Sequence, residues 1–208
     1  MQVSTSFLSS RNIPRDLKIL NETDTDFIHV DVMDGKFVKN KTMPFKEMKN
    51  IYKFTSKRLD VHLMVRKPKK YIIDYALLNT AYLTIHLELE EDIDELLDLI
   101  ATYGIKCGLS IKPSTDLEEI RTYLKRIDLV LVMAVEPGKP GQEFLEDTPD
   151  RIKKLKKMIT EEQAQVKISV DGGITDETRK YVTDADIVVS GTYVLSSDNF
   201  QEAIDSLR

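Results

Sequence analysis

The feature that most constrains the fold is a regular alternation of two sequence patterns along the whole chain. Short runs rich in β-branched and apolar residues, typical of strands, are followed by segments with helix-like apolar spacing. Eight such strand–helix units share 208 residues, or 26 residues each. Strands separated by helical crossovers predict an α/β protein with a parallel sheet. No linker or low-complexity segment interrupts the pattern, so we expect one domain over residues 1–208.

The boundaries of these elements follow from apolar periodicity, prolines and capping residues. We expect strands at 2–7, 27–33, 59–65, 82–87, 105–111, 127–135, 166–170 and 187–190. We expect helices at 14–21, 44–54, 68–78, 93–103, 117–124, 149–159, from 176 onward after a Thr175 cap, and at 200–207.

Two strands indicate how the sheet is covered. Residues 129–133 and 187–189 are continuous apolar runs, which suit parallel strands buried on both faces. Eight units with such strands predict a single-domain (β/α)8 TIM barrel. A doubly wound open sheet is the alternative that the pattern leaves open.

Charge and composition exclude several functional classes. The net charge is −5, which argues against a nucleic-acid surface. Cys107 is the only cysteine, so no internal disulfide can form, and its strand-like setting predicts a packed residue. No apolar run approaches the roughly 18–20 residues of a membrane span, and the N-terminus lacks a signal-peptide pattern. We therefore expect a cytoplasmic protein without membrane contact.

Polar residues on the strand at 27–33 suggest a metal site. Side chains alternate along a strand, so His29, Asp31 and Met33 share one face, and the Asp34-Gly35 turn follows. A histidine and an aspartate on an apolar strand are costly to bury unless they are paired or bound. Taken alone, they could be a hydrogen-bonded pair in the core.

Matching residues on other strands favour the metal site. The strand at 59–65 places Asp60, His62 and Met64 on one face, and the strand at 166–170 runs into Asp171. His86, the third histidine, lies near the end of another strand. In a barrel these ends share one rim, where His29, Asp31, His62 and Asp171 could converge on Zn, Mn, Fe or Co.

Three glycine-containing loops predict a phosphate site. Barrels of this class often hold phosphate after strands seven and eight, where the loops here read 171–173 and 190–192. The loop 136–142 is also glycine-rich. Glycines let backbone N–H groups approach an anion, so we expect a small phosphorylated substrate, although each loop alone could be an ordinary turn.

Five separated motifs resemble the ribulose-phosphate 3-epimerase family. They are His29-Val30-Asp31-Val32-Met33-Asp34-Gly35, Leu59-Asp60-Val61-His62-Leu63-Met64, Leu131-Val132-Met133, Glu136-Pro137-Gly138 and Val170-Asp171-Gly172-Gly173. The resemblance runs in order from Ser6 to Thr192. It implies a TIM barrel of the ribulose-phosphate-binding type and a metal-dependent enzyme that interconverts ribulose 5-phosphate and xylulose 5-phosphate. It also implies self-association into a homo-oligomer.

The resemblance also implies residue roles. His29, Asp31, His62 and Asp171 would hold the metal, and Asp31 and Asp171 would act as acid and base through an enediolate. The residues implied to contact the substrate are Ser6, His62, Met33, Met64, Met133, Gly138, Gly141, Gly172, Gly173, Gly191 and Thr192.

The chain departs from the family pattern at a few positions. Lys36 and Lys39 replace a histidine and a proline, Lys139-Pro140 replaces Phe-Gly, and Thr5 replaces a proline. Pro140 removes one backbone N–H that could face the ligand. These changes leave open an allulose-6-phosphate 3-epimerase or a non-catalytic sugar-phosphate-binding barrel. A lyase of related barrels is disfavoured, since no catalytic-lysine pattern replaces the His/Asp set.

Overall fold

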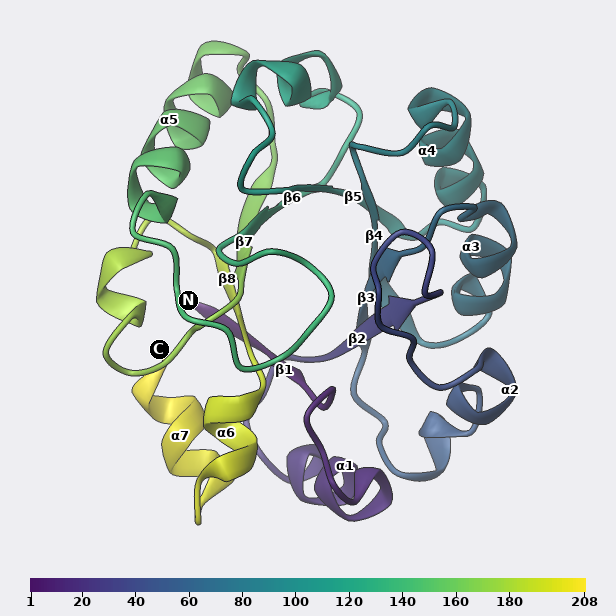
Figure 1. Ribbon diagram of the computed structural model, residues 1–208, viewed down its shortest axis with the longest axis vertical. Helices are drawn as coiled ribbons and strands as arrows, with labels where there is room; N and C mark the ends of the chain where they lie inside the picture. The colour runs from purple at the N-terminus through teal and green to yellow at the C-terminus, as the bar shows by residue number, and fades with distance from the viewer.

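The computed structural model describes all 208 residues and shows a closed barrel of eight parallel strands with helices around it (Figure 1). The strands are β1 (Gln2–Ser6), β2 (Phe27–Met33), β3 (Leu59–Met64), β4 (Thr80–His86), β5 (Lys106–Ile111), β6 (Leu129–Met133), β7 (Lys167–Asp171) and β8 (Ile187–Ser190). They pair in chain order, and β1 pairs with β8 to close the ring. The prediction of a (β/α)8 TIM barrel is confirmed, and the open-sheet alternative is wrong.

Seven α-helices and three 3-10 helices lie between the strands and after β8. The α-helices are α1 (Ile13–Asn21), α2 (Phe45–Met48), α3 (Lys69–Ala76), α4 (Ile93–Thr102), α5 (Thr148–Glu161), α6 (Thr192–Ser196) and α7 (Phe200–Ser206). The 3-10 helices are η1 (Ile51–Lys53), η2 (Leu117–Tyr123) and η3 (Arg179–Tyr181). None of these helices has the length and apolar character needed to cross a bilayer.

Three helix predictions are corrected by the structure. The helix expected over 44–54 divides into α2 and η1 at Asn50, whose side-chain amide donates to the carbonyls of Lys46 and Glu47 and competes with the helical backbone. The segment 117–124 forms the 3-10 helix η2 instead of an α-helix. Its backbone N–H groups bond to carbonyls three residues back, as Glu119 does to Asp116 and Leu124 to Arg121, although its apolar spacing also fits an α-helix.

The third correction concerns the segment after β7, where we expected a helix capped by Thr175. The hydroxyls of Thr175 and Thr178 bond to each other's backbone N–H groups, and Thr178 also donates to the carbonyl of Gly173. These bonds fold the segment into turns, and only the short η3 follows. The short helix α6 was not predicted, and the other boundaries differ by a few residues.

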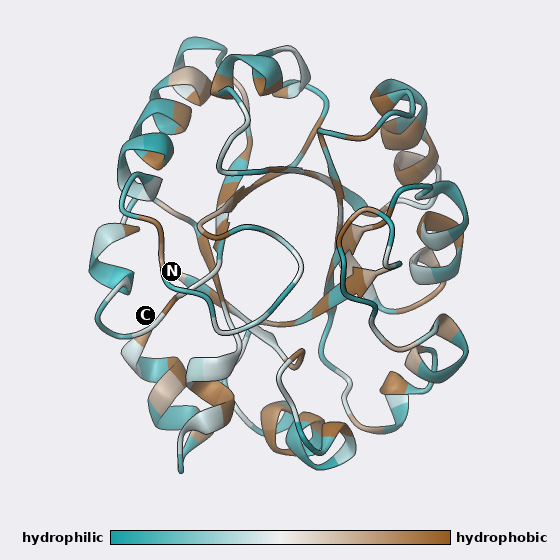
Figure 2. Cartoon of the chain, in the orientation of Figure 1, coloured by the Kyte–Doolittle hydropathy of each residue, from teal (hydrophilic) through white to brown (hydrophobic).

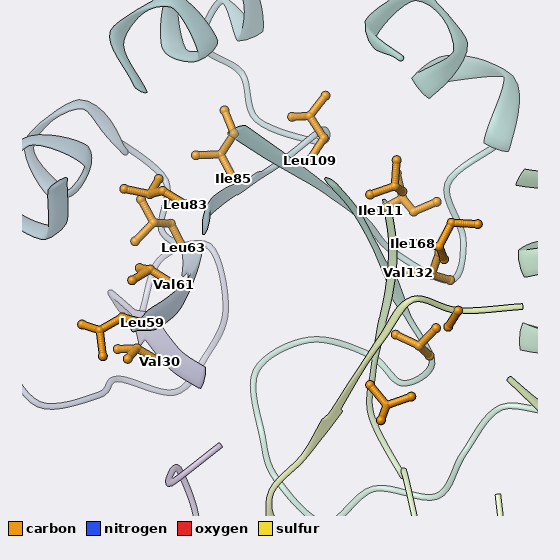
Figure 3. Close-up of a cluster of buried hydrophobic side chains, with 14 of the residues drawn as sticks. Val30, Leu59, Val61, Leu63, Leu83, Ile85, Leu109, Ile111, Val132 and Ile168 are labelled. Carbon is orange, nitrogen blue, oxygen red and sulfur yellow. The ribbon is translucent and has the colours of Figure 1, made fainter. Parts of the chain in front are cut away.

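The main core lies between the barrel wall and the helices. It contains 45 buried hydrophobic residues, and those on the strands alternate with residues that face the barrel axis. Figure 3 shows outward-facing strand side chains such as Val30, Val61, Leu83 and Leu109. In Figure 2 the strands are mainly brown, whereas α5 is largely teal. Cys107 belongs to this core, which confirms its interpretation as a packed residue.

The barrel interior is apolar at one end and polar at the other. An apolar plug fills the N-terminal end and consists of Phe27, Ala81, Tyr82, Leu129 and Ile187. The rings of Phe27 and Tyr82 meet edge to face with centroids 5.6 Å apart. Beyond the plug, toward the C-terminal ends of the strands, the interior holds buried serine, threonine, histidine and aspartate side chains beside a second apolar cluster of Leu131, Met133, Val135 and Val189. The sequence thus directs its polar groups to the rim where such barrels carry their sites.

Candidate active site and metal centre

Four side chains from three strands meet above the plug. His29 and Asp31 are on β2, His62 is on β3, and Asp171 ends β7. One ligand atom from each lies within 4.8 Å of the others. The Nε2 of His29 and the Nδ1 of His62 are each 3.3 Å from Oδ1 of Asp31 and 3.9 Å from Oδ2 of Asp171. The predicted convergence of these residues is therefore present.

The two imidazole nitrogens that face this cluster lack hydrogen-bond partners. Nε2 of His29 and Nδ1 of His62 are both buried and unpaired. Burying a polar atom without a partner costs about 1–3 kcal/mol, so such atoms require an explanation. Two imidazole nitrogens and two carboxylates form a donor set typical of divalent transition metals. The residues present fit a metal ion, and these two nitrogens are its natural ligand atoms.

The opposite nitrogen of each imidazole ring is hydrogen-bonded. Nδ1 of His29 lies 2.8 Å from Oδ2 of Asp60, which also accepts a 2.8 Å hydrogen bond from the Ser4 hydroxyl. Nε2 of His62 lies 2.9 Å from Nε2 of His86. Such outer contacts fix the orientation of metal-binding histidines. Sequence reasoning had singled out Asp60 and His86 without a role for either.

Two further contacts were missed altogether. Nδ1 of His86 lies 2.9 Å from Oε2 of Glu88, and the Ser6 hydroxyl donates to Oδ2 of Asp31 over 2.9 Å. For Ser6 the signal that could have found the contact is its spacing two residues after Ser4 on β1, because residues so spaced on a strand share a face. Glu88 lies in the turn after β4, where strand alternation no longer applies.

The environment moves the pKa values of the two central carboxyl groups in opposite directions. Burial and the nearby Asp31 charge raise the pKa of Asp171 to about 6. Burial alone would also raise the pKa of Asp31, but His29 and His62 more than offset it and hold that pKa well below its usual range. Burial opposes the charge on His29, yet Asp31 and Asp60 raise its pKa well above the ordinary value. Pairs with divergent pKa values are typical of acid–base sites.

The cluster forms the floor of a cavity of about 270 Å³ at the C-terminal face of the barrel. Asp31 and Asp171 line it, together with ten of the eleven residues expected to contact substrate: Ser6, Met33, Met64, Met133, Gly138, Gly141, Gly172, Gly173, Gly191 and Thr192. The eleventh, His62, is fully buried beneath the cavity. The segment between β6 and α5 crosses the barrel opening in Figure 1.

Close packing of two glycines holds this crossing segment in place. Gly173 has φ +64°, and a Cβ there would lie 2.6 Å from the backbone nitrogen of Phe144. Gly138 has φ +116°, and a Cβ would lie 2.8 Å from Cβ of Val38. Residues with a Cβ rarely adopt such positive φ values, and a Cβ at either position would also collide with its neighbour. Both the backbone conformation and the close packing therefore require glycine. The carbonyl of Gly138 also accepts a 2.7 Å hydrogen bond from Asn40.

The departures from the family pattern divide into two groups. Lys139 and Pro140 line the cavity. Lys36 and Lys39 do not, and the backbone N–H of Lys36 instead donates to Asp34 within the turn after β2. The hydroxyl of Thr5 is buried against that of Thr25 at 2.7 Å. Of these departures from the family pattern, only Lys139-Pro140 therefore lines the cavity.

Comparison with known proteins agrees with the geometry. A sequence model described as the ribulose-phosphate 3 epimerase family matches residues 2–195. A Helicobacter pylori protein named ribulose-phosphate 3-epimerase is 36% identical over 210 residues, covering 100% of this chain and 97% of its own length. Proteins of the same name from Synechocystis sp. and Bacillus subtilis are 35% and 33% identical, covering 99% and 100% of this chain and 92% and 98% of their own.

Solved structures support the fold. The 3-hexulose-6-phosphate synthase from Salmonella typhimurium superposes with a TM-score of 0.68 at 16% identity, over 100% of this chain and 96% of that one. A tryptophan synthase alpha subunit from Campylobacter jejuni gives 0.67 at 17% identity, over 100% and 95%. From the family match and the full-length relatives, this chain belongs to the ribulose-phosphate 3-epimerase family and is an enzyme of the isomerase class.

Proposed function

We propose that the protein is a metal-dependent epimerase that inverts C3 of D-ribulose 5-phosphate to give D-xylulose 5-phosphate. The observation that carries the proposal is the pair of carboxylates on the cavity floor. Asp31 and Asp171 project from β2 and β7 toward one point, where they meet the unpaired nitrogens of His29 and His62. Four converging groups of this kind suit proton transfer at a carbon beside a ketone.

Inversion at C3 requires a proton to leave one face of the carbon and another to arrive on the opposite face. One carboxylate accepts the C3 proton, and the electron pair moves into the enediolate formed with the C2 ketone. The other carboxyl group then donates its proton to the opposite face. The two residues exchange roles when the reaction runs in reverse, and Asp31 and Asp171 lie close enough to serve one carbon.

The metal would be held by His29, Asp31, His62 and Asp171. When bound, it would supply Lewis-acid stabilisation of the oxygens that carry the enediolate charge. Ser6 orients Asp31 through its hydrogen bond, which leaves the other Asp31 oxygen facing the two histidines. Met33, Met64 and Met133 give the cavity an apolar wall, which excludes water from the reacting carbon.

The phosphate group would lie against the loops after β7 and β8. Gly172, Gly173, Gly191 and Thr192 line the cavity there. The backbone N–H groups of the three glycines can approach an anion closely because these residues have no side chain in the way. Lys139 adds a cation at the cavity edge.

Allulose 6-phosphate, a ketose with one more carbon, is the second candidate substrate. The observation that favours it is the position of Lys139-Pro140, because this departure from the family pattern lines the cavity.

The deciding experiment measures kcat/KM for both sugar phosphates with one preparation of metal-loaded protein. We expect ribulose 5-phosphate to be the better substrate. A higher value for allulose 6-phosphate would reassign the substrate. Binding of both sugars without turnover of either would identify a sugar-phosphate sensor and refute the proposed catalysis.

A further inference from the structure

A buried hydrogen-bonded row runs outward from the metal centre on a side that the proposed chemistry does not use. Nε2 of His62 meets Nε2 of His86 at 2.9 Å, and Nδ1 of His86 meets Oε2 of Glu88 at 2.9 Å. Both imidazole rings are fully buried. The other oxygen of Glu88 accepts the backbone N–H of Lys112 at 2.8 Å and the hydroxyl of Thr115.

The direction of every hydrogen bond in this row follows from its outer end. Oε1 of Glu88 already receives two donors, and an ionised carboxylate can only accept, so Oε2 must accept the Nδ1–H of His86. A neutral imidazole with its hydrogen on Nδ1 presents a lone pair on Nε2. That lone pair must accept Nε2–H of His62. The Nδ1 of His62 is then left without a hydrogen.

We propose that Glu88 and His86 are positioning residues that fix His62 in the tautomer whose Nδ1 can bind the metal. The inference rests on the proposed metal site. Nδ1 of His62 is the buried, unpaired atom that faces Asp31 and Asp171. In the opposite tautomer that nitrogen would carry a hydrogen and could not be a ligand.

The other histidine of the proposed metal site, His29, is oriented by a carboxylate that it contacts directly. Asp60 accepts directly from Nδ1 of His29, so the nitrogen of that ring that faces the metal site is Nε2. His29 and His62 therefore offer opposite ring nitrogens to the centre. For His62, the imidazole of His86 lies between the ring and the carboxylate of Glu88. Glu88 therefore sets the position of the hydrogen on His86, and His86 in turn sets it on His62.

Packing keeps the row in one geometry. The His86 ring lies between those of His62 and Phe37, with centroids 4.9 Å and 4.7 Å away. Lys112 Nζ lies 4.3 Å from the Phe37 ring centroid. Neither imidazole can turn over without displacing its neighbours, so the tautomer is the only property of His62 that a change at Glu88 can alter without repacking.

The substitution Glu88→Gln reverses the row at nearly constant size. The Gln oxygen is required where Lys112 N–H and Thr115 donate, so the amide NH₂ faces His86. An NH₂ can only donate, so Nδ1 of His86 must accept and its hydrogen moves to Nε2. His62 must then accept at Nε2 and carry its hydrogen on Nδ1. No bond to carbon is made or broken, and only proton positions change.

Two measurements test this on the intact protein. Imidazole nitrogen NMR of the metal-free protein reads the tautomer of each ring, and only three histidines contribute. Titration with Co²⁺, followed by its visible absorption, gives the metal affinity. Wild type should show His62 with its hydrogen on Nε2, and Glu88→Gln should show it on Nδ1. The variant should bind Co²⁺ about 10- to 100-fold more weakly.

Glu90→Gln is the matched control. Glu90 lies two residues after Glu88 in the sequence. Its side chain is 79% exposed and forms an ion pair with Arg66. This variant should keep the wild-type tautomers and Co²⁺ affinity. Wild-type tautomers or wild-type Co²⁺ affinity in Glu88→Gln would overturn the inference.

A second variant covers the case in which Glu88→Gln does not fold. His86→Phe retains a ring between Phe37 and His62 and removes both hydrogen bonds. It should also weaken Co²⁺ binding, and an unchanged affinity would overturn the inference. Absence of Co²⁺ binding by wild type would instead contradict the proposed metal site, whereas the NMR comparison on metal-free protein would still decide the tautomer row.

Discussion

The hydroxyl of Ser6 on β1 donates a 2.9 Å hydrogen bond to Oδ2 of Asp31 on the adjacent strand. Ser6→Ala removes a donor to a charged group, worth about 1.5–3 kcal/mol, and frees the carboxylate to rotate. We expect kcat to fall about tenfold or more, with the fold intact by circular dichroism. Ser10→Ala removes a comparable bond, to Asp16, outside the site and serves as the control. An unchanged kcat in Ser6→Ala would contradict an orienting role.

The proposed acid–base pair predicts large losses from isosteric substitutions. Asp31→Asn and Asp171→Asn each remove a proton-transfer group and a metal ligand at nearly constant volume. Proton transfer by a positioned side chain contributes about 10²–10⁴-fold, so we expect at least that loss of turnover. Steady-state kinetics and metal analysis on the same samples provide the measurement. Wild-type rates in either variant would remove that residue from the mechanism.

Exchange of the transferred proton with solvent gives a test without mutation. Carboxyl protons exchange rapidly with water, and Asp171 retains 19% side-chain exposure at the cavity floor. Turnover in D₂O should therefore place deuterium at C3 of the product, detectable by proton NMR. Product formed without label would exclude two exchangeable carboxyl groups as the proton carriers.

Metal affinity should increase with pH through the region around 6. The pKa of Asp171 is raised to about 6 and that of His29 well above its ordinary value, so below these values protons occupy both ligands. A cation must displace them, and its apparent affinity falls as the pH falls. Above the pKa of Asp171 this carboxylate is free, while His29 continues to lose its proton as the pH rises. Co²⁺ titrations over this range would show the slope, and a flat profile would contradict it.

Packing between Gly173 and Phe144 predicts a specific defect. In Gly173→Ala the new methyl group meets the Phe144 backbone at 2.6 Å and the residue retains an unfavourable φ of +64°. The segment over the cavity must move, so we expect a higher KM in steady-state assays.

Gly104→Ala is the control for backbone strain alone. It has nearly the same φ, +67°, and no atom within 4 Å of the added methyl group. Gly104→Ala should lose about 1–2 kcal/mol of stability from its φ alone, Gly173→Ala should lose more because of the added collision, and only Gly173→Ala should lose affinity for substrate. Equal KM values would show that the contact with Phe144 does not shape the site.

The strands, and the His and Asp residues that meet above the plug, could be predicted from the sequence because each lies in a local pattern. Apolar runs such as 129–133 identify barrel strands, and the two-residue spacing of His29 and Asp31 fixes their common face. The number of units favoured a closed ring over an open sheet, and the pairing of β1 with β8 confirms it. The helix divided at Asn50 was not predictable from apolar spacing, since a side-chain amide competing for carbonyls leaves the hydrophobic pattern unchanged.

The outer contacts of the site depend on relations between strands. His62 pairs in register with Thr84, so His86 reaches His62 only because it lies two residues further along β4. The partners of Glu88, Lys112 and Thr115, come from the segment after β5. No local pattern links positions that far apart, and the link appears only when strand register and side-chain direction are known together.

The apolar plug at the N-terminal end of the barrel leaves one route to the reacting carbon. Phe27, Tyr82, Leu129 and Ile187 close the opposite end, whereas residues 136–142 line the cavity at the C-terminal end. Under the proposed reaction, substrate and product would enter and leave through that same opening. Each epimer would then compete with the other for one site, and net flux would follow the ratio of their concentrations.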